Sequence, residues 1–371
     1  MTGWIELGRR LLPRTLRHGL QRLVSLDALK MRVRARQSPL ASVTSGDDDR
    51  HGGGVRLGIL ANRASYHTHY VAACQEMGVP FRVVDPAVGD WQRQIKGAGC
   101  DLWLAWPDAT LSHWAKMYKD RCELIQSQLG VPVYPGPLER WFYEDKIRLA
   151  DWLQATGLPH PRTWVFFHAH EAGAFAGNCE LPIVFKLPFG AGATGVRIVH
   201  SRRQLRRLIR QAFGRGHVAA GHERRDRQRG SILLQEYLPQ LREWRMVRIG
   251  DSYFGHPKGR LGQFHSGSGK VEWDMPGKAL LDLLHQVTQG HGMRSMSMDV
   301  FELPDGRVLI NELQTVFGAS VAVHQLKRDG VPGRMVRDVA GDWHFESGDF
   351  ARNACATARV MDAVQQIRGR G

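Results

Sequence analysis

Cysteine is scarce in this sequence, and its spacing suits neither a zinc site nor a disulfide framework. The five cysteines are odd in number and widely spaced, with no CxxC pair. This pattern argues against both kinds of cross-link and favours a reducing, cytoplasmic compartment. Long apolar runs are also missing, since no stretch approaches the 18 residues of a membrane span. The first residues, MTGWIELGRRLLPRTL, lack the apolar core of a secretory signal.

Acidic residues are depleted in two segments of the chain, and these segments carry the whole net charge of +15. Residues 1–37 hold nine Lys/Arg and two Asp/Glu, and residues 201–230 hold ten arginines and two acids. Elsewhere bases and acids balance. A protein that is basic throughout, as nucleic-acid packaging proteins are, is therefore disfavoured, and we expect no nucleic-acid partner.

The first basic segment, residues 1–37, has the pattern of an amphipathic helix kinked at Pro13. Such a helix can lie on an anionic membrane surface or contact a protein partner. It can equally pack on the body of the protein with a solvated arginine face, and the sequence leaves these alternatives open. Residues 38–54, rich in Ser, Asp and Gly, are typical of a linker.

Short apolar runs alternate with helical patterns between residues 55 and 140. Strands are expected at 55–60, 81–85, 101–106 and 131–135, and helices at about 64–78 and 110–129. This alternation predicts a small α/β domain with a parallel sheet. A helix over 141–157 then ends at Gly157, a residue typical of helix C-termini.

The segment LPIVFKLPFGAGATGVRIV, residues 181–199, predicts two apolar strands joined by a glycine-rich turn. Lys186 stands near the end of the first strand, and glycines at 190, 192 and 195 let backbone N–H groups approach phosphate oxygens. The Walker pattern is missing, because no GKS or GKT ends the loop and a strand follows it. Taken alone, the segment also fits a purely structural hairpin.

A second hairpin is expected at residues 297–314, with its turn at Pro304-Asp305-Gly306. Alternation places Glu312 and Gln314 on one face of its second strand, and Asp299 on the first strand can join them. Two carboxylates and an amide oxygen would suit Mg²⁺, whereas solvated acids are the alternative. The apolar neighbours favour the metal, because buried acids without a cation are costly. Two further strands are expected, over 231–239 and over 242–256 as a single strand.

Taken in order, these motifs resemble the ATP-grasp superfamily over roughly residues 55–325. The chain has a lysine at the start of the central domain, a lysine before a glycine-rich hairpin, a strand-end hinge, an acid just beyond it and a closing Asp/Glu/amide set. The resemblance is to glutathione synthetase and ribosomal-protein glutamate ligases, and residues 341–353 resemble extensions of members that modify bacterial surface polysaccharides. It implies an α/β fold in which two α+β subdomains clasp ATP, preceded by the small parallel-sheet domain. The expected divisions are an arm (1–37), a linker (38–54), the small domain (55–140), the ATP-grasp domain (141–325) and a C-terminal extension (326–371).

The resemblance also implies roles for individual residues. The phosphates of ATP would contact the two lysines and the glycine-rich loop: Lys146, Lys186, Gly190, Gly192, Ala193, Thr194 and Gly195. Adenine would lie on the strand end at Gln235, Glu236, Tyr237 and Leu238, with the ribose at Glu243. Two Mg²⁺ ions, with Mn²⁺ as a substitute, would be held by Asp299, Glu312 and Gln314, although most members have Asn where Gln314 stands.

The reaction implied is phosphorylation of a carboxylate by ATP, followed by attack of an amine on the acylphosphate. Basic residues would hold the acceptor and acylphosphate, namely Arg245, Arg248, Lys258 and Arg260, with 262–270 as a substrate loop. The partners expected are small-molecule, glycan or peptide carboxylates and amines, together with a second copy in a homodimer. A non-catalytic nucleotide-binding module and a carboxylate–thiol ligase remain the alternatives.

Overall fold

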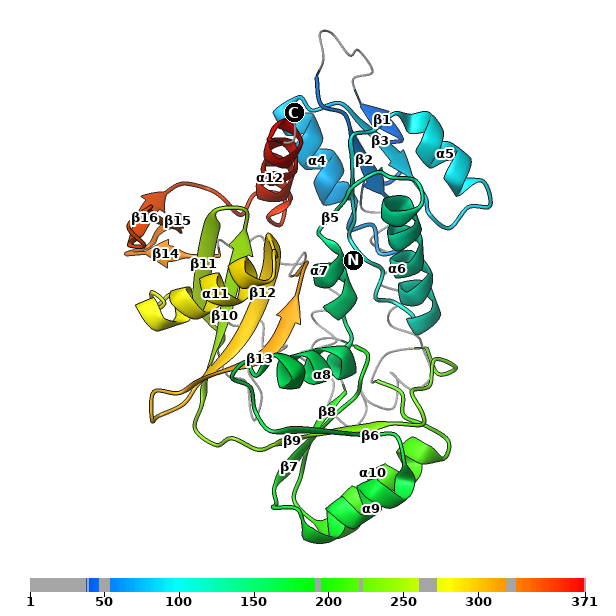
Figure 1. Cartoon of the computed structure of the whole chain (residues 1–371), viewed down its shortest axis with the longest axis vertical. Helices are drawn as coiled ribbons and strands as arrows, with labels where there is room; N and C mark the ends of the chain where they lie inside the picture. Colours follow the sequence, from blue (N-terminus) through cyan, green and yellow to red (C-terminus); the bar gives the residue numbers. More distant parts are fainter. Residues whose placement is uncertain are drawn as a thin grey trace, which may run out of the picture.

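The computed structural model describes residues 38, 40–46, 54–190, 195–219, 223–259, 272–317 and 325–369 (Figure 1). The basic arm 1–37 and the substrate loop 262–270 lie outside the described residues. The same holds for four expected site residues: Gly192, Ala193, Thr194 and Arg260.

A five-stranded sheet forms the upper part of the molecule in Figure 1, with the strand order β1-β3-β2-β4-β5. Its strands are β1 (Ser45–Gly46), β2 (Leu57–Leu60), β3 (Phe81–Val84), β4 (Leu102–Leu104) and β5 (Val133–Tyr134). All neighbours pair in parallel except β1, which joins β3 antiparallel. The α/β prediction is confirmed, and part of the expected linker becomes an edge strand. Three helices connect the strands: α4 (Thr68–Met77), α5 (Trp91–Ala98) and α6 (Ser112–Ser127).

The expected helix over 141–157 is wrong in its first part, where the structure has two helices. These are α7 (Pro137–Phe142) and α8 (Lys146–Thr156). Between them Glu144 has a left-handed backbone, with φ at 55°, which a continuous helix does not allow. Asp145 then caps α8, because its carboxylate accepts a hydrogen bond from the N–H of Arg148. Gly157 ends α8 with φ at 66°, as its sequence position predicts.

A four-stranded antiparallel sheet lies at the foot of the molecule, in the order β6-β9-β7-β8. It contains β6 (Thr163–Phe166), β7 (Ile183–Lys186), β8 (Val196–Val199) and β9 (Ile232–Glu236). Helices α9 (Ala169–Asn178) and α10 (Arg202–Phe213) cover its outer face through one apolar core (Figure 1). Ile183 and Phe185 of β7 belong to that core, so the alternate residue Lys186 faces the other side of the sheet.

The third sheet is antiparallel and has seven strands, in the order β13-β12-β10-β11-β15-β14, with β16 pairing β15. Its strands are β10 (Arg242–Ile249), β11 (Ser252–Pro257), β12 (Ser295–Glu302), β13 (Val308–Gln314), β14 (Lys327–Arg328), β15 (Val331–Arg337) and β16 (Trp343–Ser347). The single strand expected over 242–256 is wrong, because the chain reverses at Gly250, which has φ at 57°. Helix α11 (Lys278–Gly290) shares the apolar core of this sheet.

The C-terminal segment divides between two parts of the molecule. Strands β14, β15 and β16 extend the seven-stranded sheet. Helix α12 (Ala356–Arg368) instead packs on the five-stranded sheet, where Ala356, Val360 and Ala363 share a core with α4 (Figure 1). The C-terminal segment therefore connects the seven-stranded sheet to the five-stranded sheet.

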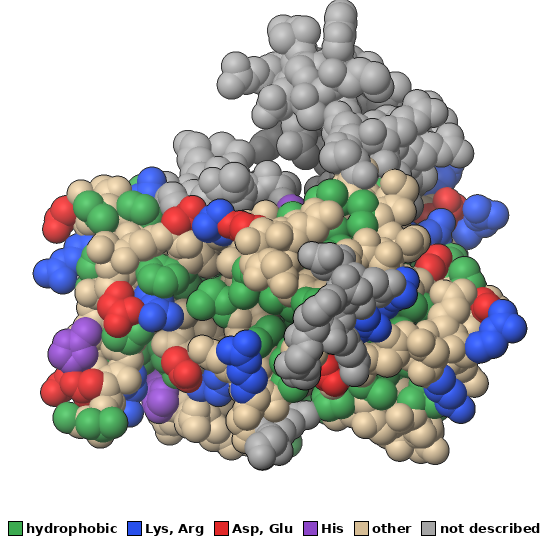
Figure 2. Space-filling model, turned by 90° about the horizontal axis from the view of Figure 1, so that it is seen from above, with side chains coloured by type: hydrophobic (Ala, Val, Ile, Leu, Met, Phe, Trp, Pro, Cys, Tyr) green, Lys and Arg blue, Asp and Glu red, His purple; other side chains and the backbone are tan. Residues whose placement is uncertain are grey.

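The exposed surface agrees with the balanced charge of the body. On the face seen in Figure 2, Lys and Arg side chains are interspersed with Asp and Glu side chains. Within the described ranges no helix is both long enough and apolar enough to cross a bilayer.

Candidate active site

The candidate site centres on a bulged hairpin in the seven-stranded sheet. Asp299 of β12 lies directly opposite Glu312 of β13. The next pair is Val300 with Ile310, so Asn311 is an extra residue on β13. In a bulge two residues of one strand face a single residue of the partner, which breaks the normal alternation of side chains. Asn311 and Glu312 are therefore both available to the lysines that approach this hairpin.

Two lysines from separate elements reach this bulge. Lys146, the first residue of α8, places its Nζ 3.4 Å from Glu312 Oε1. Lys186, the last residue of β7, donates from its Nζ to Asn311 Oδ1 at 2.8 Å. Lys146 also binds the glycine-rich hairpin twice, because its N–H donates to Pro188 O and its Nζ donates to Gly190 O. The four-stranded and seven-stranded sheets thus meet at these two ammonium groups.

A second set of charges surrounds Asp299, which is 3% exposed. Arg245 of β10 is its register partner and donates from Nε to Asp299 Oδ1 at 3.0 Å. Lys258, just after β11, donates from Nζ to Asp299 Oδ2 at 2.7 Å and also pairs with Glu243. Two of the expected site residues, Arg245 and Lys258, therefore contact Asp299 directly.

The buried charges of this cluster set one another's ionisation. Burial would raise the pKa of Asp299, but Arg245 and Lys258 hold it well below its ordinary range. Burial also disfavours charge on Lys146, yet Glu312 and Glu144 outweigh this and raise its pKa. Lys186 has less compensation, so burial lowers its pKa to about 8. A buried lysine that lacks a carboxylate in direct contact is suited to receive an anionic ligand.

Two expected site residues are placed differently from the prediction. Arg248 lies three residues from Arg245 and therefore on the opposite face of β10. Arg248 is 3% exposed, and its guanidinium donates to Gly250 O, Thr288 Oγ1 and Gln289 Oε1. Arg248 thus holds α11 against the sheet and is wrong as a residue of this site.

Gln314 does lie on the face of Glu312, but its amide oxygen does not point to the carboxylates. Its Nε2 donates to Glu312 Oε1 at 3.1 Å, and its Oε1 accepts from the N–H of Glu144 at 3.3 Å. The metal role expected for its oxygen is therefore not supported, since that oxygen is engaged by the backbone.

The expected adenine strand is β9, with Tyr237 and Leu238 following its end. The side chain of Gln235 is buried and donates from Nε2 to Thr163 Oγ1 at 3.1 Å. The carboxylate of Glu236 accepts from the N–H and Nε of Arg162 at 2.7 and 2.8 Å. These two side chains hold β6 against β9. Because they are already engaged, adenine at this point would contact the backbone of β9 and not these side chains. Glu243, expected at the ribose, has its carboxylate on Lys258.

Two residues of the cluster were missed by the sequence reading. Asn311 could not be singled out, because strand alternation places it on the face opposite Glu312 until the bulge is known. Glu144 is 6% exposed, its Oε2 has no hydrogen-bond partner among the described residues, and burial raises its pKa to about 7. Its position two residues before Lys146 gave the only sequence signal.

The carboxylates of this cluster fit a metal ion that is shared with a ligand. No group of three or more His, Cys, Asp or Glu residues converges within the described ranges. Mg²⁺ is usually bound through one or two carboxylates, with waters and substrate phosphates completing its shell. Asp299 and Glu312, paired across the hairpin, are such a set.

Several solved structures are similar to this chain over 70–72% of its length. A RimK-domain ATP-grasp protein from Sphaerobacter thermophilus is similar with a TM-score of 0.50 and 19% identity, covering 70% of this chain and 90% of that chain. The biotin carboxylase domain dimer of Hydrogenobacter thermophilus 2-oxoglutarate carboxylase, in complex with MgADP, ADP and bicarbonate, gives 0.53 and 15%, covering 72% and 65%. An ADP complex of N5-carboxyaminoimidazole ribonucleotide synthetase gives 0.52 and 13%, covering 72% and 71%.

This chain has the ATP-grasp fold. The fold expected from the order of the motifs is thereby confirmed. In sequence, an 84-residue segment is 29% identical to the mitochondrial pyruvate carboxylases of human, rat and mouse. That segment is 23% of this chain and 6% of each of those proteins, so the chain matches a small part of these curated relatives. No family model matches the chain.

Proposed function

We propose that this ATP-grasp protein is an ATP- and Mg²⁺-dependent ligase that joins a carboxylate to an amine and releases ADP. The observation that carries the proposal is the meeting of Lys146 and Lys186 at the bulge of β13, beside Glu312. Two cations from separate elements and an adjacent carboxylate pair suit a triphosphate with its metal.

In this proposal Lys146 and Lys186 contact phosphate oxygens of ATP, and the segment beginning at Gly190 covers them. Asp299 and Glu312 would hold Mg²⁺, which would supply neutralisation of phosphate charge. Binding of the metal would require Lys258 and Arg245 to release oxygens of Asp299 that they now contact. Arg245 and Lys258, the latter still paired with Glu243, would then contact the carboxylate that is phosphorylated.

The chemical reason for ATP in this reaction is that a carboxylate is a poor electrophile. Transfer of the γ-phosphoryl group to the carboxylate gives an acylphosphate with a good leaving group. Attack of an amine nitrogen on the acyl carbon forms the amide, breaks the acyl–oxygen bond and releases phosphate. Arg245 is positioned to stabilise the negative charge of the acylphosphate, because it reaches the same carboxylate that would hold the metal.

The substrates that we propose are a carboxylic acid and an amine that are small molecules, peptides or glycans. A homodimer and a contact of residues 1–37 with a membrane surface or another protein also belong to this proposal. The similar biotin carboxylase domain is a dimer, which supports testing the oligomeric state of this chain by light scattering.

The experiment is a panel of carboxylate and amine pairs, with ADP release measured and the product identified by its mass. The proposal expects ADP release that requires both substrates, together with a product that has lost one water relative to their sum. A non-catalytic nucleotide module would bind ATP without releasing ADP for any pair. A carboxylate–thiol ligase would give a thioester mass with thiols and none with amines.

A further inference from the structure

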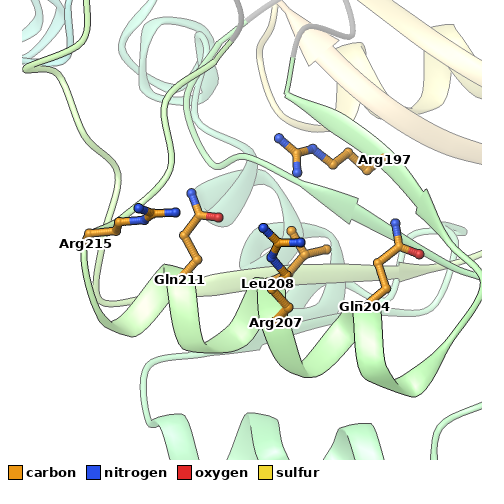
Figure 3. A pocket seen from close by; sticks show the side chains of 6 residues that line it. All are labelled: Arg197, Gln204, Arg207, Leu208, Gln211 and Arg215. Atoms are coloured by element: carbon orange, nitrogen blue, oxygen red, sulfur yellow. The ribbon is translucent and has the colours of Figure 1, made fainter.

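A second basic site lies away from the candidate active site, between β8 and α10. A pocket of about 370 Å³ opens there, on the side of the four-stranded sheet that carries the helices (Figure 3). Its lining comes from the edge strand, from α10 and from the segment that follows the helix: Arg197, Gln204, Arg207, Leu208, Gln211 and Arg215.

The helix residues in this lining share one face. Gln204, Arg207, Leu208 and Gln211 follow the i, i+3, i+4, i+7 spacing of a single helical stripe. Arg197 of β8 pairs with Phe185 of β7, a residue of the core under α10, so its side chain leaves the sheet on the helix side. In Figure 3 the guanidinium of Arg207 rises towards that of Arg197, and Arg215 turns towards Gln211.

The three guanidinium groups have no acidic partner in the part of the chain that the structure describes. Helix α10 contains no Asp or Glu. In the loop that follows it, Glu223 pairs with Arg225, and Asp226 accepts from the N–H and hydroxyl of Ser112. Within the described ranges, none of Arg197, Arg207 and Arg215 forms an ion pair. A concave surface lined by one sign of charge concentrates the field and attracts ions of the other sign.

The amides of the pocket add directional groups. Gln204 uses its Oε1 to accept from the N–H of His200 at 3.3 Å, which leaves its Nε2 as a donor. Gln211 uses its Nε2 to donate to Gly216 O at 3.2 Å, which leaves its Oε1 as an acceptor. The pocket therefore combines three guanidinium groups with one neutral hydrogen-bond donor and one acceptor.

We propose that this pocket is a binding site for a small phosphorylated anion, separate from the ATP site and independent of the proposed function. Guanidinium groups bind phosphate oxygens through paired N–H donors, and three of them match an anion with two or more negative charges. The acceptor on Gln211 suits a hydroxyl of the ligand. The six lining side chains are those of the pocket alone, and Lys146 and Lys186 take no part in it.

The test is calorimetric titration of inorganic pyrophosphate at fixed ionic strength. Three proteins are compared: wild type, a pocket variant (Arg197→Gln, Arg207→Gln and Arg215→Gln) and a charge-matched control (Arg203→Gln, Arg206→Gln and Arg210→Gln). The control residues are exposed arginines of α10 that do not line the pocket. Any binding at the ATP site is common to all three proteins. Thermal unfolding confirms that the variants are folded, as expected for exposed side chains.

The proposal predicts one binding event that weakens at least tenfold in the pocket variant and less than twofold in the control. An identical titration in wild type and the pocket variant would overturn it. Equal weakening in both variants would also overturn it. That result would mean that the arginines of α10 attract anions non-specifically, as a surface that binds a nucleic acid or a membrane does. Absence of binding in wild type has the same consequence.

Discussion

Lys186 at the end of β7 donates to Asn311 on the bulge of β13, with 2.8 Å between Nζ and Oδ1. This hydrogen bond joins the four-stranded sheet to the seven-stranded sheet. Its acceptor is a neutral amide, so the ammonium group retains most of its capacity to attract an anion. The bulge that frees Asn311 for this contact also brings Glu312 to Lys146.

The first prediction concerns turnover. Replacing Glu312 with Ala removes a carboxylate of the proposed metal pair and the partner of Lys146. ADP release should fall at least 100-fold with any substrate pair that wild type uses, because charge stabilisation in phosphoryl transfer contributes several kcal/mol. Glu302→Ala, at the far end of the same hairpin, is the matched control. ADP release by Glu312→Ala at the rate of wild type would remove this residue from the site.

A second prediction follows from the pKa of Lys186, which burial lowers to about 8. Below that pH the ammonium group is charged and ready for a phosphate. Above it, ATP binding must take up a proton, so the affinity should fall by up to about tenfold per pH unit. The measurement is the Kd for ATP between pH 7 and 9.5.

The Lys186→Arg variant is the control for this pH profile, because a guanidinium keeps its charge throughout the range. Its affinity for ATP should stay nearly constant while that of wild type declines. Parallel profiles for the two proteins would show that another group controls the binding.

Glu139 gives a prediction about stability. The residue is 3% exposed and its carboxylate accepts from the N–H groups of Gly136, Arg294 and Ser295, yet burial raises its pKa to about 7. Between pH 4.5 and 7 the folded protein thus keeps a proton that the unfolded chain has lost. The free energy of unfolding should therefore fall with rising pH, by up to about 3 kcal/mol from this group.

Urea unfolding at several pH values measures this dependence. Glu139→Gln should give a flatter profile over the same range, because its amide does not titrate. Glu123→Gln replaces an exposed residue of α6 and should keep the profile of wild type. A Glu139→Gln profile as steep as that of wild type would refute the assignment.

The close approach of two parallel strands gives a further prediction. A Cβ added to Gly58 of β2 would come within 2.3 Å of the ring of Trp103 on β4. Gly58→Ala should therefore destabilise the protein by about 1–3 kcal/mol, as overpacking does. Gly97→Ala in α5 meets nothing within 4 Å and should be neutral or stabilising by about 0.5–1 kcal/mol. Equal effects of the two changes on urea unfolding would contradict the packing described.

Local patterns in the sequence predicted the parts of the fold that depend on local interactions. The turn at residues 304–306 sets the register from Glu302 opposite Val308 to Val300 opposite Ile310, and the apolar run before Lys186 predicted β7. What the sequence could not indicate depends on tertiary contacts. The left-handed Glu144 divides the expected helix, and the bulge at Asn311 changes which side chains meet the lysines. Strand alternation alone places Arg248 on the face opposite Arg245, whereas its partner Thr288 on α11 lies 40 residues further along the chain.

The most direct test of the central claim is calorimetric binding of ATP with Mg²⁺ to wild type and to the Lys146→Ala, Lys186→Ala double variant. The claim is that these two lysines, at the bulge of β13, form the phosphate site. It predicts one ATP per chain for wild type and affinity at least 100-fold weaker for the folded double variant. Equal affinity in the two proteins would contradict the claim and move the nucleotide site elsewhere in the chain.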